Sequence, residues 1–284
     1  MQPHSHSVSR VPQTMVDNQT QPRIFDASIF AREGEDASLC FGPLHYEPNY
    51  RYPLLIWIHG LGENEQTLLS IMPEISLQNY VAIAPRGLRV DGGALRGWCD
   101  GSVPMWTSRL DSAKSLAKPC VTQSGASKTR GTSSPVSSRR ILCSPFHEAE
   151  RRIFNAIEEA KRKYHIAQDR VFIGGFDCGG TFAMRMAMCH PELFAGVLSI
   201  NGPMPQGDLP LQNWCHARQL NVFLGVGANT SQYPAPHVCD DLKLLHTAGF
   251  DVTLRHYPWG NELRPTMLHD VNQWIMEQIR QTQP

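Results

Sequence analysis

The chain has 284 residues, of which 41% are hydrophobic, and this is enough for one large α/β domain with tails. Its 26 basic and 26 acidic residues cancel, so the overall charge indicates neither nucleic acid nor an anionic membrane as the main partner. No run of about 18 apolar residues occurs, and we expect no membrane span. Eight scattered cysteines without a C-x-x-C pair predict reduced thiols, and we expect neither a metal nor a cofactor.

The first residues of the chain, 1–22, are polar and rich in Gln, Ser, His and Pro, so they bury too little apolar surface to become ordered. They lack the apolar segment of a secretory signal, which predicts a cytoplasmic protein. From residue 24 to 46, patchy alternation predicts one or two antiparallel edge strands. Residues 52–58 (YPLLIWI) are continuously apolar, as in a strand that is buried on both faces.

Helical spacing over residues 65–78, followed by an apolar run at 80–84, completes a strand–helix–strand unit and predicts a parallel sheet. Residues 88–107 are predicted to form a loop. The composition then changes over residues 108–145, which hold seven Lys or Arg and ten Ser against one acidic residue, Asp111. This bias predicts a disordered basic insertion.

The 108–145 segment has two interpretations that its composition leaves open. The simpler one is a solvated loop. The other is a docking segment for a protein partner, or for anions. Nucleic acid is disfavoured as its ligand because the segment has no aromatic side chains on which bases would stack.

Strands and helices alternate through the second half of the chain. Ser144-Pro145 is typical of a helix start, and the following apolar stripe comprises Ile153, Ala156, Ile157, Ala160 and Tyr164. Further strands are predicted at 196–200, 221–226 and 252–257, and helices at 181–189, at 236–248 with Gly249 as the cap, and around Leu268–Ile279. The pattern predicts an α/β fold with a doubly wound, mainly parallel sheet, in a single domain over residues 23–280 that the basic segment interrupts.

The most informative stretch is 171–190, VFIGGFDCGGTFAMRMAMCH, in which an apolar strand meets a helix at a glycine-dense corner. Such a corner is typical of the nucleophile elbow, G-x-S-x-G, in which a serine sits on strained backbone at the top of a strand. Aligning Gly175 and Gly179 with the outer glycines places Asp177 at the apex, where a serine is expected.

Three further stretches accompany this corner: YPLLIWIHGLGEN (52–64), APRG (84–87) and HTAGFDVTLRHYPWGNEL (246–263). Together they resemble the α/β-hydrolase fold, and within it the phospholipase/carboxylesterase-like and acyl-thioesterase proteins. The resemblance covers roughly residues 45–107 and 146–279. It implies a serine, an acid and a histidine in that chain order, with the backbone N–H groups of Leu61 and Cys178 as oxyanion donors.

Carried over position by position, the resemblance gives Asp177 for the serine, Thr230 for the acid and Asn261 for the histidine. Thr230 follows from aligning Gly227 and Pro234 with G-x-x-D-x-x-x-P, and Asn261 follows Tyr-x-x-Gly. All three positions have changed. The resemblance therefore implies a serine hydrolase that is catalytically impaired or inactive, and that acts by binding a small acyl or ester-like ligand or a protein partner.

Asp177 also has an enzymatic interpretation, because dehalogenases and epoxide hydrolases of this fold place an aspartate nucleophile at the apex. The substrate would then be an ester, an epoxide or a haloalkane, and a histidine base would be needed. The available histidines are each interpreted as structural: His59, His237, His256 and His269. Cys178 becomes the nucleophile only in a shifted register that places Phe176 where the turn requires glycine.

The position of Asp177 at a helix N-terminus also predicts an electrostatic effect. The positive end of the helix dipole stabilises a carboxylate, so we expect a lowered pKa for Asp177. The same charge would repel an anionic ligand.

Overall fold

The computed structural model describes residues 26–30, 36–89, 96–98, 145–205, 214–228, 230 and 232–281, with 26–30, 145 and 214 as backbone alone. The predicted tail at 1–22 lies outside these residues, and so does the predicted basic insertion except for residue 145. The ends of the predicted domain therefore stay predictions. None of the helices in the described ranges has the length and apolar character needed to cross a membrane.

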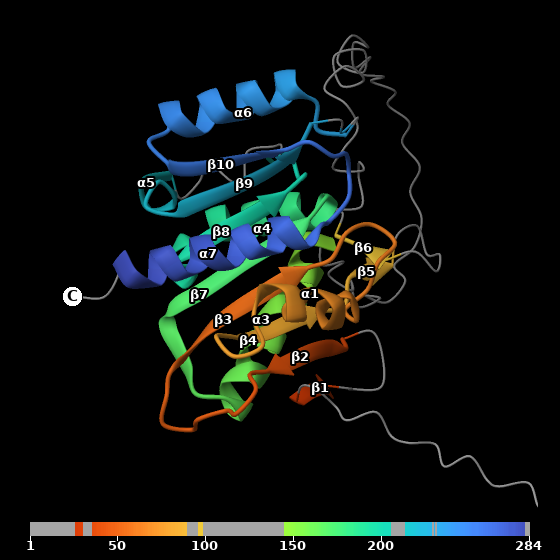
Figure 1. The fold of residues 1–284 in the computed structure, drawn as a ribbon, viewed down its shortest axis with the longest axis vertical. Coiled ribbons are helices and arrows are strands. Elements are labelled where there is room, and N and C mark those ends of the chain that lie inside the picture. The colour runs from red at the N-terminus through yellow and green to blue at the C-terminus, as the bar shows by residue number, and fades with distance from the viewer. Residues whose placement is uncertain are drawn as a thin grey trace, which may run out of the picture.

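One eight-stranded sheet organises the structure, in the order β1-β2-β4-β3-β7-β8-β9-β10 (Figure 1). Its strands are β1 (Asp26–Phe30), β2 (Ser38–Gly42), β3 (Tyr52–Ile58), β4 (Val81–Pro85), β7 (Ile166–Phe176), β8 (Gly196–Ile200), β9 (Asn221–Gly227) and β10 (Asp251–Tyr257). The pairs β1–β2 and β2–β4 are antiparallel and all the others are parallel. This confirms the predicted doubly wound, mainly parallel sheet and the antiparallel strands at its N-terminal edge.

Helices cover both faces of the sheet, as Figure 1 shows. Two helices, α1 (Thr67–Ile75) and α7 (Pro265–Gln281), pack on one face of the sheet and contribute to the hydrophobic core there. The core on the other face includes side chains of α3 (Pro145–Lys163), α4 (Cys178–Cys189), α5 (Trp214–Ala217) and α6 (Ala235–Thr247). Successive side chains of β3 point to opposite faces, so Leu54 and Ile56 enter one core while Leu55 and Trp57 enter the other. A strand covered on both faces has to be apolar throughout, which explains its sequence.

The structure departs from the sequence predictions at two places, and it confirms the predicted last strand as β10. Leu88–Arg89 (β5) and Arg96–Gly97 (β6) pair antiparallel, within the stretch predicted to be a loop. The last strand, β10, alternates in sequence but is largely exposed, because it is the edge strand of the sheet. Helix α4 begins at Cys178 instead of Thr181, so glycines form part of its first turn.

Those glycines are required by close packing between α4 and the end of β3. A Cβ atom on Gly179 would lie 2.2 Å from the carbonyl oxygen of Ile58 and 2.5 Å from that of His59. A Cβ on Gly175 would lie 2.5 Å from the same Ile58 oxygen. The missing side chains let the first turn of α4 rest directly on the backbone after β3, which brings Asp177 next to the loop that begins at His59.

Candidate functional site

Asp177 forms the corner between β7 and α4, with φ 54° and ψ −126°. Few residues other than glycine adopt this region, so the backbone is strained there. The Asp177 N–H donates to the Ile200 carbonyl at 2.8 Å, and its own carbonyl accepts the Gly180 N–H at 2.9 Å. One hydrogen bond to the neighbouring strand β8 and one from the first turn of α4 hold this strained conformation in place.

The Asp177 side chain is 8% exposed and makes no capping hydrogen bond to α4. No arginine, lysine or histidine of the described ranges forms an ion pair with it. Burial raises the pKa of this carboxyl, the Cys178 N–H offsets the rise only in part, and the charge of Glu63 adds to it. The expected lowering of the Asp177 pKa is therefore wrong, because desolvation outweighs the helix N-terminus.

Glu63 is a second carboxylate at this corner, which the sequence analysis missed. Its Oε2 accepts the Gly60 N–H at 2.9 Å. A Cβ on Gly60 would lie 3.3 Å from both Glu63 Oε2 and a ring carbon of Phe176, so the carboxylate packs beside the residue that precedes Asp177. The predicted oxyanion donor Leu61 lies in the turn between Gly60 and Glu63, and its N–H finds no acceptor in the described part of the chain.

The other two predicted site positions lie on loops that meet. Thr230 is buried, and its hydroxyl donates to the Tyr233 carbonyl at 2.8 Å. The Asn261 side chain is exposed, and its amide donates to Gln232 Oε1 at 2.8 Å. The structure thus brings positions 230 and 261 onto adjoining loops. Neither side chain forms a hydrogen bond with Asp177.

Asn201 ties these loops to the sheet, and sequence reasoning also missed it. It has φ 55°, is 1% exposed, and follows β8 as Asp177 follows β7. Its Oδ1 accepts the Gly227 N–H at 2.8 Å and its Nδ2 donates to the Gly260 carbonyl at 3.4 Å. The Asn-Gly pair directly after an apolar strand was the available signal, because asparagine tolerates positive φ at a turn.

None of the described histidines bonds to Asp177. His59 is fully buried; its Nε2 accepts the Gly87 N–H at 3.1 Å, so its Nδ1 carries the proton that pairs with the Gly60 carbonyl. Burial lowers the pKa of His59, which keeps the ring neutral in a structural position. His256 and His269 are exposed and His237 is half-buried on α6. Within the described ranges, no group of three potential metal ligands occurs either.

Removing the Asp177 charge should stabilise the fold in a pH-dependent way. The folded protein keeps the Asp177 proton to a higher pH than the unfolded chain, so wild-type stability falls as pH rises from the usual value of 3.8 through the raised pKa. Above that window, Asp177→Asn should be more stable by on the order of 1 kcal/mol, because burial disfavours a charged carboxylate more than a neutral amide. Below pH 3.8 the two proteins should be equally stable. Urea unfolding over a pH series measures the difference.

Asp177→Gly is the matched control, because it removes the same charge and also relieves the strained φ. Its gain in stability should persist at low pH, by about 1 kcal/mol or more. A gain for Asp177→Asn that does not change with pH would contradict the electrostatic explanation.

The comparisons with known proteins agree with this geometry. A family model described as phospholipase/carboxylesterase matches residues 144–279. Over 88 residues the chain is 32% identical to NocK of Nocardia uniformis subsp. tsuyamanensis, whose name describes it provisionally as an esterase. That stretch is 28% of this chain and 26% of NocK, so the match spans about a quarter of that relative.

Solved structures extend the likeness over most of the chain. The carboxylesterase of Bacillus cereus superposes with a TM-score of 0.56 at 13% identity, over 90% of this chain and 96% of that one. SOBER1 of Arabidopsis thaliana superposes with a TM-score of 0.60 at 18% identity, over 81% of this chain and 100% of its own. The chain has the α/β-hydrolase fold. Within that fold, its residues 144–279 are similar to the phospholipase/carboxylesterase family.

Proposed function

We propose that this chain binds a small acyl or ester-like ligand at the elbow without turning it over as a serine hydrolase. One observation carries the proposal: no histidine of the described ranges forms a hydrogen bond or ion pair with Asp177, and the two positions that would supply an acid and a base hold Thr230 and Asn261. A hydroxyl and an amide neither take up a proton near neutral pH nor stabilise an imidazolium by charge. A hydrolase of this family needs both functions.

The elbow keeps features that suit binding. The Leu61 N–H is a donor for a ligand carbonyl, and the first turn of α4 presents the positive end of its dipole. In the proposed binder, the Asp177 carboxyl lies where a serine would attack, so the acyl carbon meets a buried carboxyl whose pKa is raised by desolvation. Loss of triad members leaves at most about 10³–10⁴-fold catalysis over water, from the oxyanion donors and binding.

A covalent role for Asp177 is the competing function, favoured by the strained backbone at this residue. A carboxylate at the apex can form an ester with a haloalkane, an epoxide or an ester substrate. Release of that ester requires a base that activates water. The raised pKa of Asp177 weighs against this function. So does the absence of a hydrogen bond between Asp177 and any described histidine.

The test compares wild-type protein, Asp177→Ala and the control Asp169→Ala, which changes an exposed aspartate. With p-nitrophenyl butyrate, we expect the same low rate for all three proteins. Intact mass spectrometry after incubation with a haloalkane and an epoxide should show no adduct. Thermal unfolding with 2-decanone, a ketone that has no leaving group, should shift to a higher temperature. Turnover or an adduct that Asp177→Ala alone abolishes would overturn the proposal, and so would the lack of any shift with 2-decanone.

A further inference from the structure

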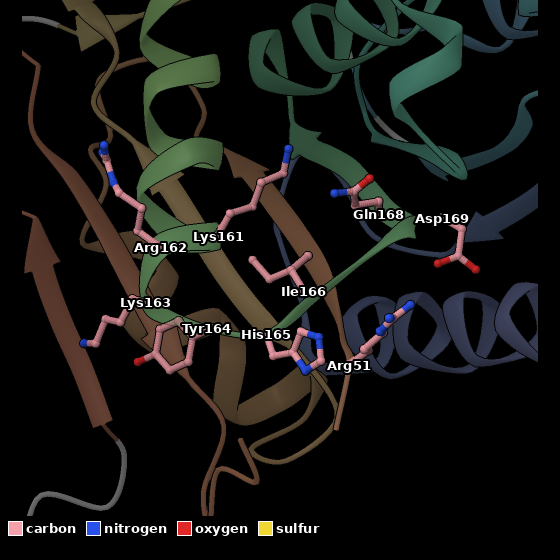
Figure 2. Close-up of a pocket in the computed structure, with 9 residues that line it drawn as sticks. All are labelled: Arg51, Lys161, Arg162, Lys163, Tyr164, His165, Ile166, Gln168 and Asp169. Atoms are coloured by element: carbon pink, nitrogen blue, oxygen red, sulfur yellow. The ribbon is translucent and has the colours of Figure 1, made fainter. Parts of the chain in front are cut away.

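A recess lies at the end of the sheet opposite to Asp177. Asp177 and Asn201 follow the carboxyl ends of parallel strands, whereas this recess lies where β3 and β7 begin. Its volume is about 740 Å³, within the range of small-molecule sites. It is lined by Arg51, Lys161, Arg162, Lys163, Tyr164, His165, Ile166, Gln168 and Asp169 (Figure 2).

The lining is strongly cationic although the whole chain is neutral. Four Lys or Arg side chains and one histidine line the recess against a single carboxylate, that of Asp169. The negative end of the α3 dipole accounts for the basic residues in its last turn, Lys161–Lys163. It does not account for Arg51 and His165, which come from other segments. Basic side chains from two parts of the chain, Arg51 and the end of α3, thus line one recess.

The existing ion pairs leave these charges available. Lys161 pairs with Glu158 at 2.9 Å, an exposed pair one helical turn apart of a kind worth less than about 1 kcal/mol. Arg51 forms no ion pair with any described residue. Asp169 lies 3.8 Å from Arg170 and is exposed. A ligand would therefore displace little when it binds Arg51 and Lys161.

Figure 2 shows that the lining residues lie on two sides of the turn between α3 and β7. Lys161 and Gln168 point toward one another, with Ile166 between them, and Arg51 and His165 lie at the lower end of the same hollow. Arg162 and Lys163 point to the other side of the turn. Arg51, Lys161, His165 and Gln168 thus lie on one side of the turn, and Arg162 and Lys163 lie on the other.

Contacts of His165 with its neighbours fix its position in the recess before a ligand binds. The His165 N–H donates to Tyr46 Oη at 2.8 Å, and its ring Nδ1 lies 3.2 Å from the Pro48 carbonyl. A carbonyl only accepts, so Nδ1 carries a proton and Nε2 is left for a ligand. Tyr46 packs edge-on against Tyr164, with the ring centroids 5.1 Å apart. The imidazole is thus held in one orientation before any ligand arrives.

One edge of the recess is formed where the pairing of β3 with β7 becomes irregular. Ile166 pairs with Tyr52, but the next pair is Val171 with Leu54, so residues 167–170 stand outside the ladder between β3 and β7. This bulge carries Gln168 to the edge of the recess. Irregular pairing at this point re-aims a polar side chain toward Lys161.

We propose that this recess binds the phosphate group of a small phosphorylated molecule. The Arg51 guanidinium offers a planar pair of donors and Lys161 a compact charge, and both suit phosphate oxygens. The Gln168 amide adds a further donor. The site is independent of the elbow, so its test does not depend on the function proposed for Asp177. A free phosphate ester and a lipid headgroup share this chemistry.

Titration calorimetry with glycerol 3-phosphate at low salt tests the site. Arg51→Gln and Lys161→Gln should each weaken binding by about tenfold, because each removes one charge-assisted hydrogen bond. The control Lys243→Gln removes the same charge from an exposed position on α6 and should leave the affinity unchanged. Succinate, a dianion without phosphate geometry, should bind more weakly than glycerol 3-phosphate.

The outcomes distinguish a soluble phosphate ester from a lipid headgroup, and some of them would overturn the proposed site. Binding of glycerol 3-phosphate in solution supports a soluble ligand, and binding only to phosphatidylcholine vesicles that contain phosphatidic acid supports a headgroup. Equal weakening by Lys243→Gln would mean diffuse attraction to basic surface and would overturn the proposal. Failure to bind either phosphate source would do the same, provided that circular dichroism shows the wild-type protein to be folded.

Discussion

Esterase activity should rise steeply when the three changed positions are restored together, as Asp177→Ser with Thr230→Asp and Asn261→His. We expect this triple variant to hydrolyse p-nitrophenyl butyrate about 10²–10⁴-fold faster than Asp177→Ser alone, which is the range that a positioned general base contributes. A serine without a base is a weak nucleophile. The single substitution should therefore gain little.

The geometry favours the triple variant because the loops that carry the three positions are already in place. The 2.8 Å bond between Asn261 and Gln232 shows that the loop after β10 touches the loop after β9, which also carries Thr230. Asp177 keeps the strained backbone of a nucleophile. The activity is measured as kcat/KM at neutral pH.

The matched control keeps the restored pair and removes the nucleophile: Asp177→Ala with Thr230→Asp and Asn261→His. It should be as inactive as the wild-type protein. The assignment of positions 230 and 261 would be wrong if this control were as active as the triple variant. It would also be wrong if Asp177→Ser alone were as active as the triple variant.

The largest effect on stability should come from Gly179→Ala. The added Cβ would lie 2.2 Å from the Ile58 carbonyl oxygen, a contact with backbone at the end of a central strand. Neither α4 nor β3 can move away without opening the core between them. We expect a loss of more than about 3 kcal/mol in the free energy of unfolding, or failure to fold.

Gly225→Ala is the control for this substitution, because Gly225 lies on β9 and its added Cβ would meet no atom closer than 3.4 Å. Its effect should stay below about 1 kcal/mol. Urea unfolding followed by circular dichroism compares the two. Equal stability of Gly179→Ala and the wild-type protein would contradict the close approach of α4 to β3.

The fold is readable from the sequence where both faces of an element are covered. All seven residues of β3 are buried, and a strand of this kind has to be apolar throughout, which makes it visible as a run. The closing helix is visible for a related reason, since Leu268, Val271 and Trp274 form one buried stripe of α7. The two-residue strands β5 and β6 lack such a signal.

The candidate site is less readable, because its properties depend on atoms far apart in the chain. The glycine corner locates Asp177, but a rule for helix N-termini gave the wrong direction for its pKa. Burial beneath the surrounding loops and the charge of Glu63 decide that direction, and neither is visible in a local motif. The role of Asn201 likewise arises only when Gly227 and Gly260 come together.

Asn201 holds the loops after β9 and β10 through backbone groups alone, the Gly227 N–H and the Gly260 carbonyl. Neither bond involves the side chains at positions 230 and 261. Substitutions at those two positions therefore leave both Asn201 bonds in place, and this part of the architecture is separable from the chemistry of the corner. In a chain built in this way, side chains at the site can be substituted while the bonds that position its loops are kept.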